Sequence, residues 1–181
     1  MSENSNPPVM GRVYSLESFG SVDGPGVRFV IFLQGCAMRC KFCHNADSWD
    51  MQKGDLYSSD ELLKKALRFR SYWAEKGGIT ISGGEPLLQM DFLLDFCKKA
   101  KAEGVDITID SSGNPFTRKE PFFSKFQELM NYVDLFLLDI KEIDDETHKD
   151  LTGCSNGNIL DMAQYLSEIG KPVWIRHVLV P

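Results

Sequence analysis

The sequence lacks the long apolar runs and the basic charge that mark membrane proteins and nucleic-acid-binding proteins. No apolar run approaches the roughly 20 residues that span a bilayer, and the first ten residues are polar and contain proline, unlike a signal peptide. The formal net charge is −6, so nothing provides a general attraction to phosphate backbones or anionic lipids. We therefore expect a cytoplasmic protein that has neither nucleic acid nor a membrane as its partner.

The sequence also lacks the paired cysteines of a disulfide framework. Its five cysteines are an odd number, and three of them crowd into positions 36–43. That arrangement is typical of a metal site in a compartment that keeps thiols reduced. With 181 residues, of which 43% are apolar, the chain is long enough for one domain and too short for two ordinary ones.

Short apolar runs alternate with amphipathic segments along the chain. We expect a flexible tail over residues 1–8 and one core domain over 9–181, which opens with an extended segment that ends in the turn Asp23-Gly24-Pro25-Gly26. The pattern predicts strands at 27–33, 78–82, 105–110, 133–140 and 172–180, and helices from Ser58 or Ser59 to 73 and at 89–102, 121–132 and 158–169.

Five strands separated by helices require right-handed crossovers and hence a parallel sheet. The predicted fold class is therefore α/β, a partial (β/α) barrel with outer helices. A complete barrel would need more units, and Pro181 directly follows the last predicted strand. We expect from this that the chain is shortened at its C-terminus, and that one edge strand is left unpaired.

The three clustered cysteines directly follow the first predicted core strand. Cys36, Cys40 and Cys43 are spaced Cys-x3-Cys-x2-Cys, so that three thiolates can converge on one centre. A structural zinc site that adds His44 is one interpretation, because three cysteines and one histidine are an acceptable ligand set. Cys43 and His44 are adjacent, however, whereas zinc sites usually use two separated pairs, and three thiolates suit an iron–sulfur cluster with one iron left open.

This loop resembles the signature of the radical S-adenosylmethionine superfamily, in which an aromatic residue, here Phe42, precedes the third cysteine. The resemblance implies that Cys36, Cys40 and Cys43 hold a [4Fe-4S] cluster whose open iron binds the amino and carboxylate groups of S-adenosylmethionine. An electron from the reduced cluster then breaks the S–C5′ bond, which yields methionine and a 5′-deoxyadenosyl radical. Phe42, Cys43 and His44 would belong to the cofactor site.

Two later motifs extend the resemblance. Gly83, Gly84 and Glu85 follow the second predicted strand, as the superfamily's second motif does, and would receive the methionine amino group of the cofactor. Asp139, Ile140 and Lys141 follow the fourth strand, and resemble an Asp-x-Lys motif that contacts the sulfonium cofactor. Each stretch alone is as well explained by a turn or by a strand end.

Further stretches resemble the branch whose members install a glycyl radical on a partner enzyme. They are residues 18–28, residues 43–45 and residues 173–176. The resemblance implies a glycyl radical enzyme as the partner, most closely pyruvate formate-lyase, and a flavodoxin- or ferredoxin-type electron donor. It also implies a monovalent cation near the cofactor, and contacts to the partner or to this cation from Asp23, Asn45, Asp110 and Arg176.

The other cysteines and histidines fit no second centre. Cys97 lies in an amphipathic helix and Cys154 in a polar loop, and His148 and His177 are isolated, so we assign these four residues no role. Residues 46–57 contain no cysteine, unlike the ferredoxin-like insert of several other activating enzymes. Two alternatives remain open: a radical S-adenosylmethionine enzyme that acts on a small molecule, and a non-enzymatic zinc-binding module.

Overall fold

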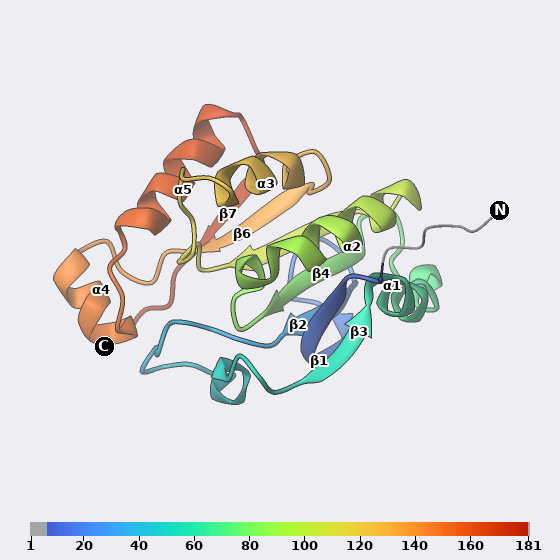
Figure 1. Cartoon of the computed structure of the whole chain (residues 1–181), viewed down its shortest axis with the longest axis horizontal. Helices are drawn as coiled ribbons and strands as arrows, with labels where there is room; N and C mark the ends of the chain where they lie inside the picture. The colour runs from blue at the N-terminus through green and yellow to red at the C-terminus, as the bar shows by residue number, and fades with distance from the viewer. Residues whose placement is uncertain (1–6, 181) are drawn as a thin grey trace.

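The computed structural model describes residues 7–180 and contains a seven-stranded sheet with the order β3-β1-β2-β4-β5-β6-β7 (Figure 1). Five neighbouring strands, from β2 to β7, are parallel, while β1 pairs antiparallel with both β2 and β3. The strands are β1 (Met10–Gly20), β2 (Arg28–Leu33), β3 (Asp55–Ser58), β4 (Gly78–Gly83), β5 (Ile107–Ser111), β6 (Leu135–Asp139) and β7 (Val173–Arg176).

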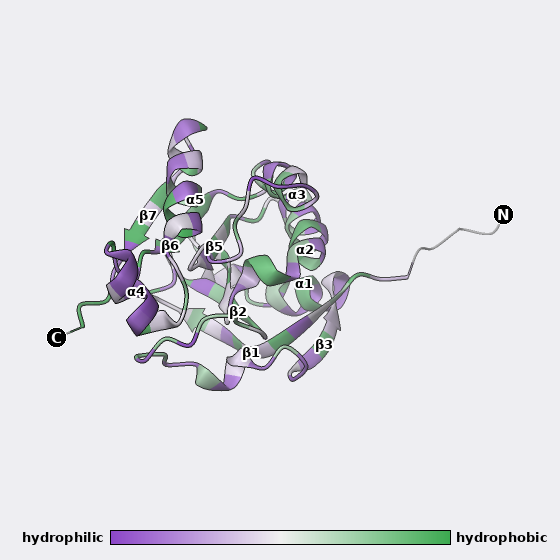
Figure 2. Ribbon diagram, turned by 60° about the vertical axis from the view of Figure 1, so that its left-hand side comes forward, coloured by the Kyte–Doolittle hydropathy of each residue, from purple (hydrophilic) through white to green (hydrophobic). Residues whose placement is uncertain are grey.

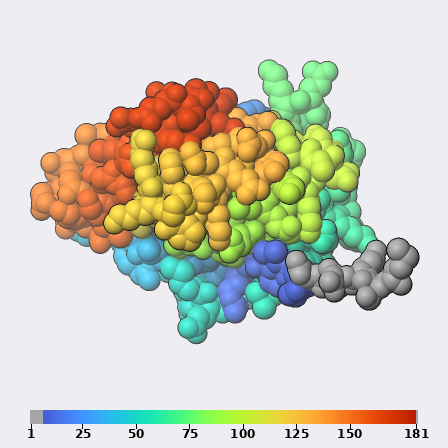
Figure 3. All heavy atoms as spheres, turned by 45° about the horizontal axis from the view of Figure 1, so that its top comes forward, coloured from blue at the N-terminus to red at the C-terminus, as the bar shows by residue number. Residues whose placement is uncertain are grey.

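Helices connect the parallel strands and cover one face of the sheet, which they largely hide in the space-filling view (Figures 1 and 3). The α-helices are α1 (Ser59–Leu67), α2 (Met90–Ala102), α3 (Phe122–Leu129), α4 (Asp145–Thr152) and α5 (Gly157–Glu168). Short 3-10 turns lie at Ala46–Trp49, Arg70–Tyr72 and Pro86–Gln89. None of the helices in the described part of the chain combines the length and the apolar character that crossing a bilayer requires.

The expected α/β class and the parallel order of the five predicted strands are confirmed. The expected number of about five strands is wrong, because the extended segment after residue 9 forms β1, and β3 pairs with its outer edge. The helix expected to reach residue 73 ends at Leu67, and the last strand covers only Val173–Arg176. The tail expected at residues 1–8 falls mainly on residues 1–6, outside the described residues.

The core lies between the sheet and the helices. Every residue of β4 from Gly78 to Ser82 is buried, as expected for a strand covered on both faces, and α2 buries one face against the sheet. Hydropathy follows this division in Figure 2, where the exposed sides of the helices are mainly hydrophilic. A capping box between Ser58 and Glu61 begins α1.

A buried arginine lies at the amino-terminal end of β2. Arg28 is fully buried, and its guanidinium donates to Thr80 Oγ1 at 2.6 Å and to Asp106 Oδ1 at 2.8 Å. It also donates to the carbonyl of Pro25 at 3.0 Å, while Thr80 Oγ1 donates to the carbonyl of Asp23 at 2.6 Å. These bonds tie the Asp-Gly-Pro-Gly turn to the interior strands β2 and β4. The polar residues of the candidate site lie at the other, carboxyl-terminal ends of the parallel strands.

Candidate functional site

A cavity of about 210 Å³ lies where the parallel strands end and the cysteine loop begins. Active sites of parallel barrels form at this end, because the strands deliver loops from several parts of the sequence to one place. The lining includes twelve residues that the sequence singled out: Cys36, Cys40, Phe42, Cys43, His44, Asn45, Gly83, Gly84, Asp110, Asp139, Lys141 and Arg176. The structure thus brings together residues that are 140 positions apart.

The backbone of the cysteine loop is held by hydrogen bonds from a neighbouring segment and from the side chain of Arg39. Gly35 N donates to the carbonyl of Ser48 at 2.7 Å, and Arg39 Nη1 donates to the carbonyls of Cys36 and Met38 at 2.6 and 2.8 Å. Cys36 is buried, whereas Cys40 and Cys43 are partly exposed to the cavity. The loop therefore presents three thiols to the cavity from a fixed backbone.

The thiols stand in an environment that suits a cluster better than a single ion. All three are free, and no fourth cysteine lines the cavity in the described part of the chain. Among residues 7–180, no three histidine, cysteine or acidic side chains are placed to hold one metal ion. Three thiols on one cavity suit an iron–sulfur cluster with one iron left open.

Burial keeps the thiols of Cys36 and Cys40 protonated in the free protein. It raises the pKa of Cys36 to about 12, and the neighbouring Glu85 adds to this effect. Burial also raises the pKa of Cys40, although Lys141 counteracts it. Because thiolates are the ligands, binding of a cluster must release these protons.

The glycine pair passes so close to the cysteine loop that a side chain would not fit. Gly83 has a φ of +116°, and a Cβ on Gly84 would lie 2.2 Å from the carbonyl oxygen of Gly35. Gly84 N donates to the carbonyl of Leu33 at 2.9 Å, and Glu85 N donates to that of Gly35 at 2.7 Å. The pair thus joins the end of β4 to the residue that precedes Cys36.

Glu85 does not line the cavity, although the sequence placed it in the cofactor site. Its side chain is 1% exposed and accepts hydrogen bonds from Ser111 Oγ at 2.7 Å, from Ser112 Oγ at 2.6 Å and from the backbone N–H of Ser112 at 2.9 Å and of Leu87 at 3.0 Å. Burial raises the pKa of Glu85, and the four donors oppose that shift. The carboxylate therefore ties the glycine loop to the end of β5 from behind the cavity wall.

Two carboxylates and two cations form an ionic network that lines the same cavity. Lys141 Nζ donates to Asp139 at 2.6 Å, and Arg176 reaches Asp139 at 3.1 Å and Asp110 at 3.3 Å. Ser82 Oγ donates to Asp110 at 2.7 Å. The side chains come from the ends of β4, β5, β6 and β7, which are neighbours in the sheet in this order. The network therefore depends on the strand order.

The two carboxylates differ in their affinity for protons. Burial, followed by repulsion from Asp139, raises the pKa of Asp110 to about 6. Burial acts in the same direction on Asp139, but Lys141 and Arg176 outweigh it and hold the pKa of Asp139 below its usual value. Asp139 is therefore ionised at neutral pH and balances the two cations.

The remaining predicted residues lie around this centre. The ammonium of Lys141 is 5.8 Å from the centre of the Phe42 ring, and the side chain of Ile140 does not line the cavity. Asp23 lies outside the lining, but it feels the charge of Arg176, which lowers its pKa against the larger, raising effect of burial. The Asp-Gly-Pro-Gly turn is thus within electrostatic reach of the cavity.

Sequence reasoning missed six lining residues: Met38, Trp49, Ser82, Ser111, Ser112 and Val178. Ser82 precedes the glycine pair, and Ser111 and Ser112 follow Asp110. These three serines would have been predicted if every residue at the end of a parallel strand had been included in the site. Trp49 has no such signal, because a 3-10 turn brings it back to the cysteine loop, where Cys36 N donates to its carbonyl at 3.3 Å.

Comparison with known proteins supports an iron–sulfur cluster in this cavity. Residues 22–160 match the family model of the 4Fe-4S single cluster domain. The chain is 51% identical over 174 residues to the pyruvate formate-lyase-activating enzyme of Listeria monocytogenes, covering 96% of this chain and 70% of that protein. The enzyme of the same name from Streptococcus mutans is 53% identical over 175 residues, with 96% and 66% covered.

The fold also occurs in solved structures of low sequence identity, including one that covers most of this chain. It is the crystal structure of Streptococcus suis SuiB bound to the precursor peptide SuiA, which is 20% identical. The superposition has a TM-score of 0.69 and covers 92% of this chain and 34% of that chain. The arrangement of strands and helices described above is therefore a known fold for a chain of very different sequence.

Proposed function

The chain belongs to the family of pyruvate formate-lyase-activating enzymes, and we propose that it installs a glycyl radical on a partner enzyme of the pyruvate formate-lyase type. Its cofactors are a [4Fe-4S] cluster and S-adenosylmethionine. One observation carries the proposal: three free thiols, a glycine pair and an ionic network from four strand ends line a single cavity. We further propose that residues 9–181 act as one radical S-adenosylmethionine core domain.

We assign the cluster to Cys36, Cys40 and Cys43, since no other cysteine in the described chain lines the cavity. The chemistry that cluster and cofactor supply when bound is a one-electron cleavage to methionine and a 5′-deoxyadenosyl radical, which removes a hydrogen atom from glycine. The chain's own residues bind, orient and screen the reactants.

The cofactor contacts follow from the donors and acceptors that face the cavity. The glycine pair offers backbone groups without side chains in the way, which suits the amino group of the cofactor. Asp139 and Lys141 provide a paired carboxylate and ammonium in the same cavity, beside Phe42. His44 lines the same space and completes the proposed set.

We place the partner's glycine segment between the cavity and the Asp-Gly-Pro-Gly turn. Asp23 and Arg176 flank this path, and Asn45 and Asp110 line the cavity beside it. Asp23 would accept hydrogen bonds from the backbone of the incoming segment, and Asp110 would bind the partner or a monovalent cation. A flavodoxin- or ferredoxin-type protein would supply the electron, in the cytoplasm, where cysteine thiols stay reduced.

The test is electron paramagnetic resonance on the full chain, reconstituted anaerobically with iron and sulfide and mixed with S-adenosylmethionine, a reductant and pyruvate formate-lyase. We expect a doublet glycyl radical signal on the partner that requires all components. Cleavage of the cofactor without that signal would favour a small-molecule substrate. One tightly bound zinc per chain and no sulfide would instead contradict the enzymatic proposal altogether.

A further inference from the structure

The carboxyl-terminal end of α4 contacts the cysteine loop directly. The backbone N–H of Arg39 donates to the carbonyl of Thr152 at 2.7 Å, and that of Lys41 donates to the carbonyl of Leu151 at 2.9 Å. Both amides lie between the cysteines, and both acceptors are last-turn carbonyls that have no partner within the helix. Figures 1 and 2 show α4 beside the long loop that follows β2. The helix end and the loop thus satisfy each other's backbone groups.

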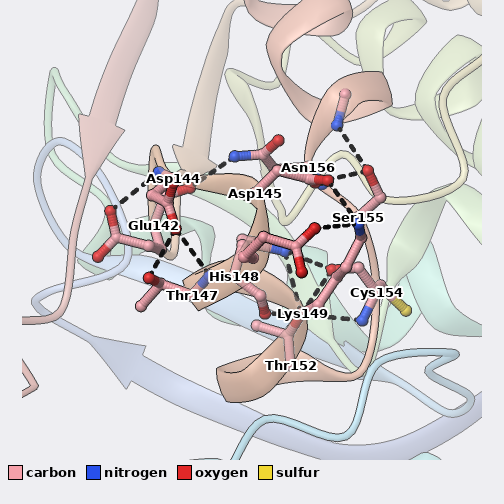
Figure 4. Close-up of polar contacts among 12 residues, drawn as sticks. Glu142, Asp144, Asp145, Thr147, His148, Lys149, Thr152, Cys154, Ser155 and Asn156 are labelled. Atoms are coloured by element: carbon pink, nitrogen blue, oxygen red, sulfur yellow. Dashed lines mark hydrogen bonds and ion pairs between the residues drawn. The ribbon is translucent and has the colours of Figure 1, made fainter.

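A buried histidine fixes this end of the helix (Figure 4). His148 is fully buried, and its Nδ1 lies 2.6 Å from the carbonyl oxygen of Cys154. Because a carbonyl oxygen only accepts, Nδ1 carries the hydrogen and donates it. Thr152 Oγ1 donates to the carbonyl of His148 at 2.8 Å and accepts from Cys154 N at 3.2 Å. These bonds close the chain tightly around Gly153, immediately after the two carbonyls that hold the loop.

A histidine at position 148 lowers the stability of the folded state more than an apolar side chain would. Its Nε2 is buried and has no hydrogen-bond partner among the described residues. An unpaired buried polar atom destabilises the folded state, so an apolar side chain of similar size would avoid this cost. The donor at Nδ1, however, makes the shortest hydrogen bond to the carbonyl of Cys154, at 2.6 Å, whereas Thr152 Oγ1 lies 3.3 Å from the same oxygen.

The segment that follows α4 is hydrogen-bonded to the segment that precedes and begins the helix. Asn156 Nδ2 donates to the carbonyls of Glu142 and Ile143 at 3.0 and 2.7 Å, and Asp145 accepts from Ser155 Oγ at 2.6 Å. Glu142 directly follows Lys141, which lines the cavity. The segment from β6 through α4 is therefore a closed unit that connects one wall of the cavity to the cysteine loop.

We propose that His148 is a positioning residue, which holds the end of α4 as a brace that keeps the cysteine loop in its binding conformation before the cluster is present. The brace also commits the amides of Arg39 and Lys41 to carbonyls, away from the cysteine sulfurs. Hydrogen bonds to the sulfurs help to set the reduction potential of a cluster, and the negative end of a helix disfavours an added electron. The brace therefore favours a low potential. This inference rests on the proposed role of the three cysteines.

Hydrogen exchange of the full chain without its cluster tests the brace on its own. In His148→Ala, we expect exchange in a peptide covering residues 36–43 to be faster by about tenfold, as for the loss of an ordinary hydrogen bond, with strands β4 and β5 unchanged. His148→Asn retains a donor near the Nδ1 position and should restore slow exchange. Glu146→Ala is the matched control, since the side chain of Glu146 is 85% exposed on the same helix and pairs with Lys149, away from the cysteine loop.

Wild-type exchange of residues 36–43 in His148→Ala would overturn the brace. If His148→Ala unfolds throughout, Thr152→Val replaces it as the test variant, because valine keeps the shape of threonine and removes its hydroxyl. Faster exchange confined to residues 36–43 supports the proposal, and wild-type exchange overturns it.

After reconstitution, the reduction potential of the cluster in His148→Ala should shift upward and that in His148→Asn should not. Equal potentials in His148→Ala and the wild type would overturn the electrostatic part of the proposal. A wild-type chain that binds no cluster contradicts the proposed function and leaves the exchange result standing.

Discussion

At the scale of single residues, the site depends on close approaches as much as on ligands. The sequence motif around Gly83 and Gly84 was identified by its place after a strand, but its physical reason is visible only in three dimensions. The carbonyl oxygen of Gly35 occupies the space that a Cβ on Gly84 would need. A pattern of glycines indicates such an approach without telling which segment makes it.

We expect Gly84→Ala to destabilise the protein by about 1–3 kcal/mol, the usual cost of forcing extra atoms into a packed site. The added methyl group would also push the glycine loop away from Gly35, so S-adenosylmethionine should bind more weakly. Denaturation by urea and equilibrium binding of the cofactor measure the two effects. Gly157→Ala is the control, because its Cβ would meet only Ser155 Oγ at 3.9 Å. Equal stability and binding in the two variants would show that the close approach does not matter.

The sequence indicates which charged residues belong to the site, but it does not indicate which of them contact one another. Asp139, Lys141 and Arg176 all follow from the resemblance. The contacts of Arg176 with both Asp139 and Asp110 depend on the order of β5, β6 and β7 in the sheet. Glu85 shows the opposite case, since its motif suggested a cavity residue and the fold turned it into a buried link between two loops.

At the scale of elements, long amphipathic segments were predictable and short polar ones were not. Helices α2 and α5 lie within one residue of their expected bounds, because their apolar spacing is clear. Helix α4 was missed, since its eight residues are mostly charged or polar and carry no apolar stripe. Its signals were the N-cap Asp144 and Gly153 at the carboxyl end, where φ is +79°.

Acid should loosen α4 selectively. Hydrogen bonds from Thr147 lower the pKa of Asp144, and contacts with Lys149, Ser155 and the backbone of Asn156 lower that of Asp145. The unfolded chain therefore binds these protons more readily than the folded chain, so the stabilisation is complete above the ordinary aspartate pKa of about 3.9 and is lost as the pH falls through the lower folded values.

The measurement is the urea midpoint of the chain without its cluster, at pH 5 and pH 3. We expect Asp145→Asn to have a lower midpoint than the wild type at pH 5, and the difference to shrink at pH 3. Asp91→Asn should match the wild type at both values, because Asp91 is 70% exposed and forms only a surface ion pair with Lys125. A constant difference between Asp145→Asn and the wild type would contradict the assigned pKa direction.

At the scale of the whole molecule, the parallel part of the sheet was predictable and its antiparallel edge was not. Crossover connections leave one sensible arrangement for β2, β4, β5, β6 and β7. Strand β1 reads only as an extended segment, since its sequence does not say which edge it joins. Strand β3 has four residues, too few for a reliable pattern. Strand β1 pairs with β2, and β3 pairs with the outer edge of β1. The backbone N–H of Gln34, directly after β2, donates to the carbonyl of Arg12 in β1 at 2.9 Å.

The central claim is that three cysteines, and no others, hold one cluster that cleaves S-adenosylmethionine. Its most direct test is iron content beside the rate of reductive cofactor cleavage, after anaerobic reconstitution of single cysteine variants. Cys36→Ala, Cys40→Ala and Cys43→Ala should each lose the cluster and the cleavage, because no other thiol lines the cavity in the described chain. Cys97→Ala and Cys154→Ala should keep about four irons per chain, the stoichiometry of the cluster. Loss of the cluster in Cys97→Ala together with its retention in Cys40→Ala would contradict the account.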